Sequence, residues 1–354
     1  MLEANYFIEK AYRLALKAKG ETSPNPLVGA VIVKNNKIIG FGYHKKAGLP
    51  HAEISALRKA GVLAKGADLY VTLEPCCHYG KTPPCTDAII KSGIKKVFIG
   101  MIDPNPLNRG KGIKILKKHK IITQVGFLEK ELKKMNEVFI KYVTKNLPFV
   151  TVKVGQSLDG KIATKTYQSK WITSNESRNY AYKLRDSYDA IMVGINTVIK
   201  DNPLLNSKRA IKIVVDSSLK TPINSRIFSK KSPNKVITAT INKNYKKLSN
   251  KAEILLVKAK NKQVDLKDLM KKLAKKEISN ILVEGGGTLI GSLFDEKLVD
   301  KVLFFVAPKI IGGKNSISSI QGEGINNLKE APILKNINFK RIGSDILIEG
   351  NLNK

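Results

Sequence analysis

Cysteine is scarce in this 354-residue sequence, and long apolar runs are missing from it. Only three cysteines occur, Cys76, Cys77 and Cys85, and they lie within ten residues of one another. This excludes a disulfide framework and is typical of a metal or reactive site in a reducing compartment. No segment approaches the roughly 18 consecutive apolar residues of a membrane span, and charged residues interrupt the N-terminal segment where a signal peptide needs an apolar run. We therefore expect a cytoplasmic protein without a membrane partner.

Arginine is also scarce, although the chain is strongly basic. The formal net charge is +34, yet only eight of the 63 basic residues are arginine, the residue that dominates bidentate recognition of phosphates and bases. The lysines are scattered through both halves and form no clustered stripe, which a nucleic-acid-binding surface requires. We therefore expect no nucleic-acid partner.

The first half of the chain alternates between strand and helix patterns. Two apolar runs flank Asn35-Asn36, which is a hairpin signal. The expected elements are strands at residues 27–34, 37–44, 67–73 and 95–100 and helices at residues 51–63 and 85–93. Such alternation predicts a layered α/β domain.

The second half begins where this pattern breaks, at the Lys-Asn-Leu-Pro of residues 145–148. We place the domain boundary there, giving domains 1–146 and 147–354. Apolar runs rich in Val and Ile follow, with helical segments between several of them, so we expect a second α/β domain with a mostly parallel sheet. The expected strands lie at residues 149–155, 188–194, 210–216, 235–241, 252–257, 280–286 and 301–308.

His51, Cys76 and Cys85 form a candidate zinc site. One imidazole and two thiolates match a catalytic zinc, which uses three protein ligands and keeps its fourth position open for water. Each of the three residues follows a proline, which indicates chain turns or helix starts, where the helix dipole favours a thiolate. Because three of the four histidines and all the cysteines fall between residues 44 and 85, a metal site is favoured over ordinary core cysteines.

Glu53 is the candidate proton carrier beside this site. Bound zinc lowers the pKa of water, but a proton must still reach the departing group, and a carboxylate that does not bind the metal can carry it. Residues two apart are separated by about 200° in a regular helix. His51 and Glu53 can therefore face one pocket only at an irregular first turn, which Pro50 makes plausible.

The His-Ala-Glu of residues 51–53, followed by two Pro-Cys pairs, resembles the cytidine deaminase superfamily, whose signature is H-x-E with P-C-x-x-C. Here the spacing is longer, EPCCHYGKTPPC at residues 74–85. Together with SPNPLVGAVIV (23–33) and DPNP (103–106), it is similar to the deaminase half of the bifunctional riboflavin-biosynthesis deaminase-reductases. The resemblance implies that the substrate's ring, ribose and phosphate contact Asn25, His44, His78, Lys81 and Asn105. A solvated side chain is an equal alternative for Lys81.

A glycine-rich turn, VEGGGTL at residues 283–289, presents backbone N–H groups and a helix start to an anion. It lacks the G-x-G-x-x-G pattern, so alone it is a weak sign of a dinucleotide. It is the last of five segments that occur in the order found in the reductase half of the same family. The other four are TVKVGQSLDGKIA (151–163), KWITS (170–174), RDSYDAIMVGINTVIKDNPLL (185–205) and VVDSSLKTP (214–222).

This second resemblance implies a dihydrofolate-reductase-like fold, NADPH as cofactor and a set of binding positions. They are Lys153, Ser169, Trp171, Thr173, Arg185, Thr197, Asp201, Leu205, Lys208, Ser217, Glu284 and Gly286. A lysine in an apolar strand must find a partner, which favours function for Lys153. A core aromatic remains open for Trp171 and a turn residue for Asp201.

Lys208 departs from the family, which usually has DNPxLxxR with arginine at this position. If that side chain binds the substrate phosphate, either the bidentate guanidinium has been replaced by the point charge of a lysine, or Arg209 has taken over this contact.

Taken together, the two resemblances predict a cytidine-deaminase-like three-layer domain followed by a dihydrofolate-reductase-like domain.

The predicted function combines two reactions on a small phosphorylated pyrimidine. They are zinc-dependent deamination of 2,5-diamino-6-(5-phosphoribosylamino)pyrimidin-4-one and NADPH-dependent reduction of its ribosyl group, in a homo-oligomer. Two alternatives stay open. A base deaminase with an appended domain predicts the compact P-C-x-x-C spacing, and a nucleic-acid-binding protein with a structural zinc predicts a fourth protein ligand.

Overall fold

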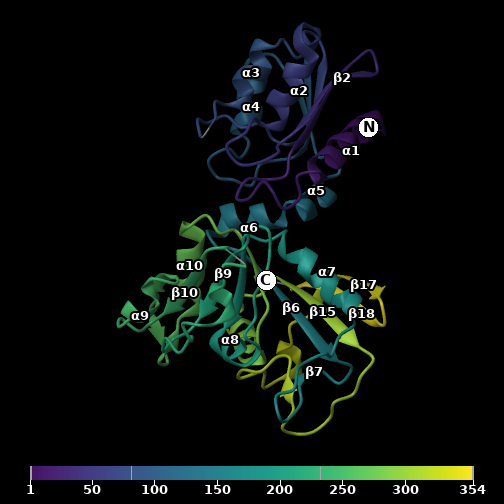
Figure 1. Cartoon of the computed structure of the whole chain (residues 1–354). Coiled ribbons are helices and arrows are strands. Elements are labelled where there is room, and N and C mark those ends of the chain that lie inside the picture. Colours follow the sequence, from purple (N-terminus) through teal and green to yellow (C-terminus); the bar gives the residue numbers. More distant parts are fainter. Residues whose placement is uncertain (1, 81, 232, 353–354) are drawn as a thin grey trace. The chain divides into compact units, whose positions relative to one another are not determined.

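The computed structural model describes residues 2–80, 82–231 and 233–352. Contacts divide the chain into two compact units, Met1–Leu147 and Pro148–Lys354, and each has a sheet of its own (Figure 1). No described helix is long and apolar enough to cross a membrane.

The first unit contains a five-stranded mixed sheet in the order β2-β1-β3-β4-β5. Its strands are β1 (Gly29–Lys34), β2 (Lys37–Tyr43), β3 (Asp68–Leu73), β4 (Lys96–Met101) and β5 (Ile122–Val125). β1 pairs antiparallel with β2 and β3, whereas β3, β4 and β5 run parallel. The predicted hairpin is confirmed: Asn35 and Asn36 form its turn, with left-handed φ values of 49° and 60°.

Helices cover both faces of this sheet. They are α1 (Leu2–Leu16), α2 (Ala52–Ala60), α3 (Cys85–Lys91), α4 (Lys111–Lys118), α5 (Glu129–Met135) and α6 (Glu137–Lys145), with a 3-10 helix at Gly61–Ala64. Gly29 lies against α1, where a Cβ would come within 1.9 Å of the Ala11 carbonyl oxygen, and Gly42 lies against α2, 2.5 Å from that of Ala52. Gly42 pairs with Ala30, the neighbour of Gly29, so the two glycines face opposite sides of the sheet. The unit is therefore a three-layer α/β/α structure.

The second unit contains a nine-stranded sheet in the order β11-β10-β9-β8-β14-β6-β15-β18-β17. Its strands are β6 (Phe149–Ser157), β8 (Ala190–Gly194), β9 (Ile211–Val215), β10 (Val236–Thr240), β11 (Glu253–Leu256), β14 (Asn280–Val283), β15 (Lys301–Ala307), β17 (Leu334–Ile342) and β18 (Asp345–Leu352). The first seven strands of this order run parallel, and β18 and β17 add antiparallel pairs at one edge. The prediction of a mostly parallel sheet is confirmed.

Short helices and two small sheets complete the second unit. The helices are α7 (Asn175–Arg185), α8 (Ile195–Asp201), α9 (Lys246–Ser249), α10 (Leu266–Lys275) and α11 (Gly287–Asp295), with 3-10 turns at Arg226–Phe228 and Leu328–Glu330. The small sheets pair β7 (Lys161–Ala163) with β16 (Ile317–Ser318) and β12 (Ala259–Lys260) with β13 (Gln263–Val264). Ile281, Leu282 and Val283 of β14 are all buried, as a strand covered on both faces requires.

Candidate functional site

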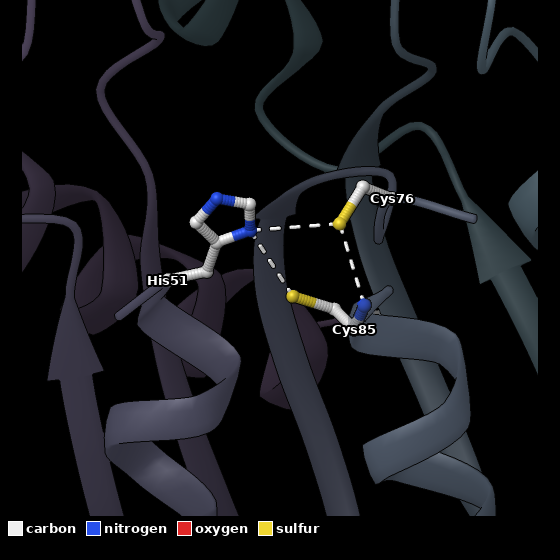
Figure 2. A group of neighbouring side chains, drawn as sticks. All are labelled: His51, Cys76 and Cys85. Atoms are coloured by element: carbon white, nitrogen blue, oxygen red, sulfur yellow. Dashed lines mark hydrogen bonds between the residues drawn. The ribbon is translucent and has the colours of Figure 1, made fainter. Parts of the chain in front are cut away.

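Three candidate metal ligands converge in the first unit. His51 Nδ1 lies 3.2 Å from Cys85 Sγ and 3.5 Å from Cys76 Sγ, and the three ligand atoms lie within 4.8 Å of one another (Figure 2). Around a tetrahedral zinc, with Zn–S of about 2.3 Å and Zn–N of about 2.05 Å, nitrogen and sulfur are separated by about 3.6 Å. The imidazole and the two thiols therefore fit Zn²⁺ in donor type and spacing.

Each ligand is placed by the end of a secondary-structure element. His51 caps the N-terminus of α2 with extended backbone (φ −68°, ψ 165°), Cys76 follows β3 after two residues, and Cys85 begins α3. The backbone N–H of Cys85 donates to Cys76 Sγ at 3.3 Å. A hydrogen bond with Cys85 and the nearby His51 lower the pKa of the Cys76 thiol to about 4, so Cys76 is the more acidic thiol of the pair. The same pairing, together with burial, raises the pKa of Cys85.

Glu53 is buried next to these ligands, with 3% of its surface exposed. Because His51 lies outside the helix and Glu53 in its first turn, the 200° separation of a regular helix does not apply to them. Burial and the negative charge of Cys76 raise the pKa of Glu53 to about 7. The neighbouring Cys85 thiol acts on this pKa in the opposite direction, so the predicted proton carrier lies beside the metal ligands.

Asn25 and His44 form a hydrogen-bonded pair beside His51. Asn25 Nδ2 donates to His44 Nε2 at 3.0 Å, and His44 Nδ1 donates to the Pro50 carbonyl at 3.3 Å. The rings of His44 and His51 meet edge to face, with centroids 5.2 Å apart. Burial lowers the pKa of His44, which favours the neutral imidazole that these two contacts need.

The loop between the two cysteines carries the remaining predicted residues. His78 Nδ1 is buried and has no hydrogen-bond partner among the described residues, and Lys81 lies outside the described residues. Asn105, on another loop, is held by its backbone N–H, which donates to Asp103 at 2.8 Å. Thr82 was missed from the sequence: its hydroxyl lies 3.3 Å from His51 Nε2, where it can orient the ring.

A buried polar network that sequence reasoning also missed holds the Cys76 loop. The Glu74 carboxylate accepts backbone N–H groups of Asp103, Gly110 and Ile113 at 2.9–3.2 Å. Asn108 accepts the Cys77 N–H at 2.9 Å and donates to Asp103 Oδ2 at 3.0 Å. This network joins the metal-ligand loop to the Asp-Pro-Asn-Pro loop. The one signal in the sequence was a glutamate directly before Pro75-Cys76.

The second unit contains a cavity of about 1050 Å³. It is lined by eleven of the twelve residues predicted for this half, namely Lys153, Ser169, Trp171, Thr173, Arg185, Thr197, Asp201, Leu205, Lys208, Glu284 and Gly286. Ser217 does not line it. Its hydroxyl accepts the Val264 N–H at 3.1 Å, and its carbonyl accepts the Thr240 hydroxyl at 3.1 Å. Ser217 therefore joins two strand ends outside the cavity.

Glu284 connects two cations in the wall of this cavity. Arg185 Nε donates to Glu284 Oε1 at 2.6 Å and Arg185 NH2 to Oε2 at 2.9 Å, while Lys153 Nζ lies 3.0 Å from Oε2. Burial alone would raise the pKa of Glu284, but the charges and hydrogen bonds of Lys153 and Arg185 outweigh it and hold the pKa at about 2. Lys153 thus has the partner that its place in an apolar strand required.

The glycine-rich turn begins α11 at the same cavity. Gly286 caps the helix with extended backbone, and its N–H donates to the Thr197 hydroxyl at 3.1 Å. Lys208 also lines the cavity and is 3.9 Å from Asp186, whereas Arg209 is absent from the lining. The structure therefore favours Lys208, whose ammonium group is a point charge in place of the family's bidentate arginine, over Arg209 as the candidate for contact with the substrate phosphate.

Comparison with known proteins covers nearly the whole chain. Residues 1–101 match the cytidine and deoxycytidylate deaminase zinc-binding region, and residues 148–348 match the RibD C-terminal domain. The chain is 45% identical to riboflavin biosynthesis protein RibD of Aquifex aeolicus, over 98% of each chain. It is 36% identical to that of Escherichia coli, over 98% of this chain and 99% of the relative.

Solved structures agree. Acinetobacter baumannii RibD, form 1, superposes with a TM-score of 0.90 at 34% identity, with 99% of both chains covered. A Thermotoga maritima deaminase/reductase superposes with a TM-score of 0.88 at 36% identity, again with 99% of both covered. The predicted fold class is confirmed, and the family assignment favours the enzyme over both alternatives. The family assignment implies Zn²⁺ as the cofactor of the deaminase region and NADPH as the cofactor of the reductase region. The chain therefore belongs to the RibD family, the bifunctional deaminase and reductase enzymes of riboflavin biosynthesis.

Proposed function

We propose that residues 1–146 deaminate 2,5-diamino-6-(5-phosphoribosylamino)pyrimidin-4-one and that residues 147–354 then reduce its ribosyl group to a ribityl chain. The observation that carries this proposal is the convergence of His51, Cys76 and Cys85 beside the buried Glu53. The Thermotoga maritima relative is a diaminohydroxyphosphoribosylaminopyrimidine deaminase/5-amino-6-(5-phosphoribosylamino)uracil reductase, which supports the same pair of reactions.

In the deaminase half, His51, Cys76 and Cys85 would hold the zinc ion. When bound, zinc supplies a Lewis acid that makes water nucleophilic at neutral pH. Glu53 takes a proton from the attacking water and delivers it to the amino nitrogen that leaves as ammonia. The C–N bond breaks, and the ring carbon ends as a carbonyl. Thr82 keeps the His51 ring oriented for its ligand role.

The substrate of this half would be held by residues around the metal ligands. We assign the pyrimidine ring to Asn25 and the neutral His44, whose hydrogen bond fixes both side chains. His78 has a buried nitrogen available for a partner, and Asn105 sits on a loop tied to the metal-ligand loop. Lys81 completes the set as a phosphate partner, because ammonium groups bind phosphate as point charges.

In the reductase half, NADPH when bound would supply the hydride for the anomeric carbon of the ribose. The bond from this carbon to the ring oxygen breaks, and the released oxygen needs a proton. Lys153 is the donor we assign, because its ammonium group lines the cavity and is held by Glu284 at 3.0 Å. Arg185 shares Glu284 and fixes its orientation with two hydrogen bonds.

The rest of the cavity wall positions the two reactants. Gly286 lies at the start of α11, where backbone N–H groups favour the phosphates of a dinucleotide, and Thr197 of α8 accepts the Gly286 N–H. Lys208 is the candidate for the substrate phosphate. We assign Ser169, Trp171, Thr173, Asp201 and Leu205 to the same wall. We assign no ligand contact in this cavity to Ser217, because Ser217 does not line it.

We further propose a cytoplasmic homo-oligomer. Thiolate ligands need a reducing compartment to remain thiolates. The edge strand β17 exposes Ile337 and Phe339, at 56% and 74%, and an apolar sheet edge is a common place for a second chain to associate. Light scattering behind a sizing column tests the oligomer: a monomer mass would contradict it.

Two single-site variants test the division of labour. Glu53→Gln is expected to stop deamination while leaving reduction of the deaminated intermediate intact, and Lys153→Met is expected to do the reverse. A mixture of the two variants should then convert the starting pyrimidine to the ribityl product, which neither makes alone. If either variant loses both reactions, or the mixture stays inactive, the assignment of one reaction to each unit is wrong.

A further inference from the structure

The chain has a single tryptophan, and it lies in the wall of the reductase cavity. Trp171 belongs to the segment Ser169–Thr173, which connects β7 to α7 and lines the cavity along its whole length. The side chain is 60% exposed, so it is not a packed core aromatic. A large exposed ring needs other contacts to keep one orientation.

Three side chains from outside fasten this segment. The Ser169 hydroxyl donates to Asp201 at 3.2 Å, and Lys309 Nζ donates to the Trp171 carbonyl at 2.7 Å. The first contact holds the Ser169 side chain and the second the Trp171 backbone, and neither is made to the indole ring. Arg178 is the third, and it is the one that meets the ring.

Arg178 contacts the segment in two ways at once. Its guanidinium carbon lies 4.3 Å from the centroid of the Trp171 ring, and its NH1 donates to the Thr173 carbonyl at 2.7 Å. NH2 donates to Asn175 Oδ1 at 3.3 Å. Stacking of a cation on indole is among the stronger cation–π contacts, and the planar guanidinium alone can stack and donate in two directions.

The start of α7 places Arg178 for this purpose. Ser174 caps the helix, because its hydroxyl accepts the Ser177 N–H at 3.2 Å. Arg178 therefore lies on the first turns of a capped helix, which directly follows the segment it contacts. The contacts of Arg178 therefore join the start of α7 to the cavity wall.

We propose that Arg178 is a positioning residue of the reductase, which holds the Trp171 ring and the Thr173 carbonyl in the orientation that the bound cofactor or substrate needs. This inference rests on the proposed reductase function of the cavity. Arg178 itself also lines the cavity, and the role we assign to it is exerted through Trp171 rather than on the reactants directly. A lysine at this position would keep a positive charge over the ring but lose the planar guanidinium that donates to Thr173 and Asn175 at the same time.

The sole tryptophan makes the proposal directly measurable. Acrylamide quenching of its fluorescence in the ligand-free enzyme measures how accessible the indole ring is to solvent. Steady-state assays give KM for NADPH and for the deaminated pyrimidine. For Arg178→Met we expect quenching to rise about twofold, as an unheld ring is more accessible. We expect KM for at least one reactant to rise about tenfold, a loss of about 1.4 kcal/mol. Arg178→Lys should fall between the variant and the wild type in both readouts.

Two controls separate this effect from damage elsewhere. Deaminase activity of the same Arg178→Met preparation shows that the first unit is intact, and a cooperative urea unfolding transition followed by Trp171 fluorescence shows that the second unit, which carries the substitution, is folded. Lys183→Met removes a positive charge from the same helix, and we expect it to leave the quenching unchanged.

Other outcomes would overturn the proposal in distinct ways. A higher KM with unchanged quenching would mean that Arg178 touches a reactant itself. Changed quenching with unchanged KM values would mean that the contact is only structural, and no change in either would remove the role altogether. If the wild type itself does not oxidise NADPH, the proposed reductase function fails instead, and quenching of the ligand-free variants still decides whether Arg178 holds the ring.

Discussion

Glu284→Gln is expected to destabilise the second unit strongly at neutral pH. Glu284 is buried and is the shared partner of Arg185 and Lys153, at 2.6 to 3.0 Å. Removing one partner from a buried ion pair leaves the remaining charge uncompensated, which costs about 3–5 kcal/mol. The pKa gives an independent figure: a fall from 4.5 to about 2 corresponds to about 3 kcal/mol at about 1.4 kcal/mol per unit. We therefore expect a loss of about 3 kcal/mol in the free energy of unfolding.

The sign of the pH dependence follows from the lowered pKa. A carboxyl group whose pKa is lower in the folded than in the unfolded state stabilises the fold while it is ionised. The contribution of Glu284 is thus fully present above its unfolded value of 4.5 and is lost as the pH falls through about 2. The difference between wild type and Glu284→Gln should be constant from pH 7 to pH 5 and shrink steadily below that range.

Urea unfolding of the full chain measures this difference in the free energy of unfolding for the second compact unit of the chain. Trp171 is the sole tryptophan and lies in the second unit, so its fluorescence reports that unit alone. Glu330→Gln is the matched control, because this glutamate is exposed in the same unit, and we expect it to change the free energy by less than about 0.5 kcal/mol. A loss below about 1 kcal/mol for Glu284→Gln, or one that does not depend on pH, would refute the reasoning.

Three further variants probe other parts of the account. Cys85→Ser should lower the zinc content measured by elemental analysis and abolish deamination, while reduction of the deaminated pyrimidine continues; retained zinc would contradict the ligand assignment. Asn108→Ala removes the acceptor of the Cys77 N–H and should weaken zinc binding in chelator competition by about tenfold, whereas unchanged affinity would show that the network is dispensable. Lys208→Arg should lower KM for the phosphorylated pyrimidine by restoring a bidentate fork, and a higher KM would exclude the phosphate role.

Most of the fold could be predicted from the sequence because its signals are local. The Asn35-Asn36 turn, the alternation of strand and helix before residue 100, and the Val- and Ile-rich runs after residue 148 each depend on neighbouring residues. The metal ligands could be predicted for a different reason. Cysteine and histidine are rare in this chain, so their gathering in one segment was informative.

The contacts that hold the sites could not be predicted in the same way. Glu284 and Arg185 are 99 residues apart, and Glu74 accepts N–H groups 29 to 39 residues away. Nothing in a local pattern distinguishes such a pair from a solvated charge. Arg178 and Thr82 were missed because each contacts another residue of a site; Thr82 lies inside the EPCCHYGKTPPC segment, but a threonine there has no metal-ligand chemistry to single it out. Ser217 differs from the other residues implied by the resemblance, because its motif is present but its side chain does not line this cavity.

The central claim is that one chain deaminates and then reduces the same pyrimidine. The most direct test is a mass-spectrometric time course of the zinc-loaded protein with 2,5-diamino-6-(5-phosphoribosylamino)pyrimidin-4-one, with NADPH withheld and then added. The account predicts that the deaminated pyrimidine accumulates without NADPH and disappears into the ribityl product once NADPH is present. Deamination that itself requires NADPH, or a deaminated product that persists after NADPH is added, would contradict it.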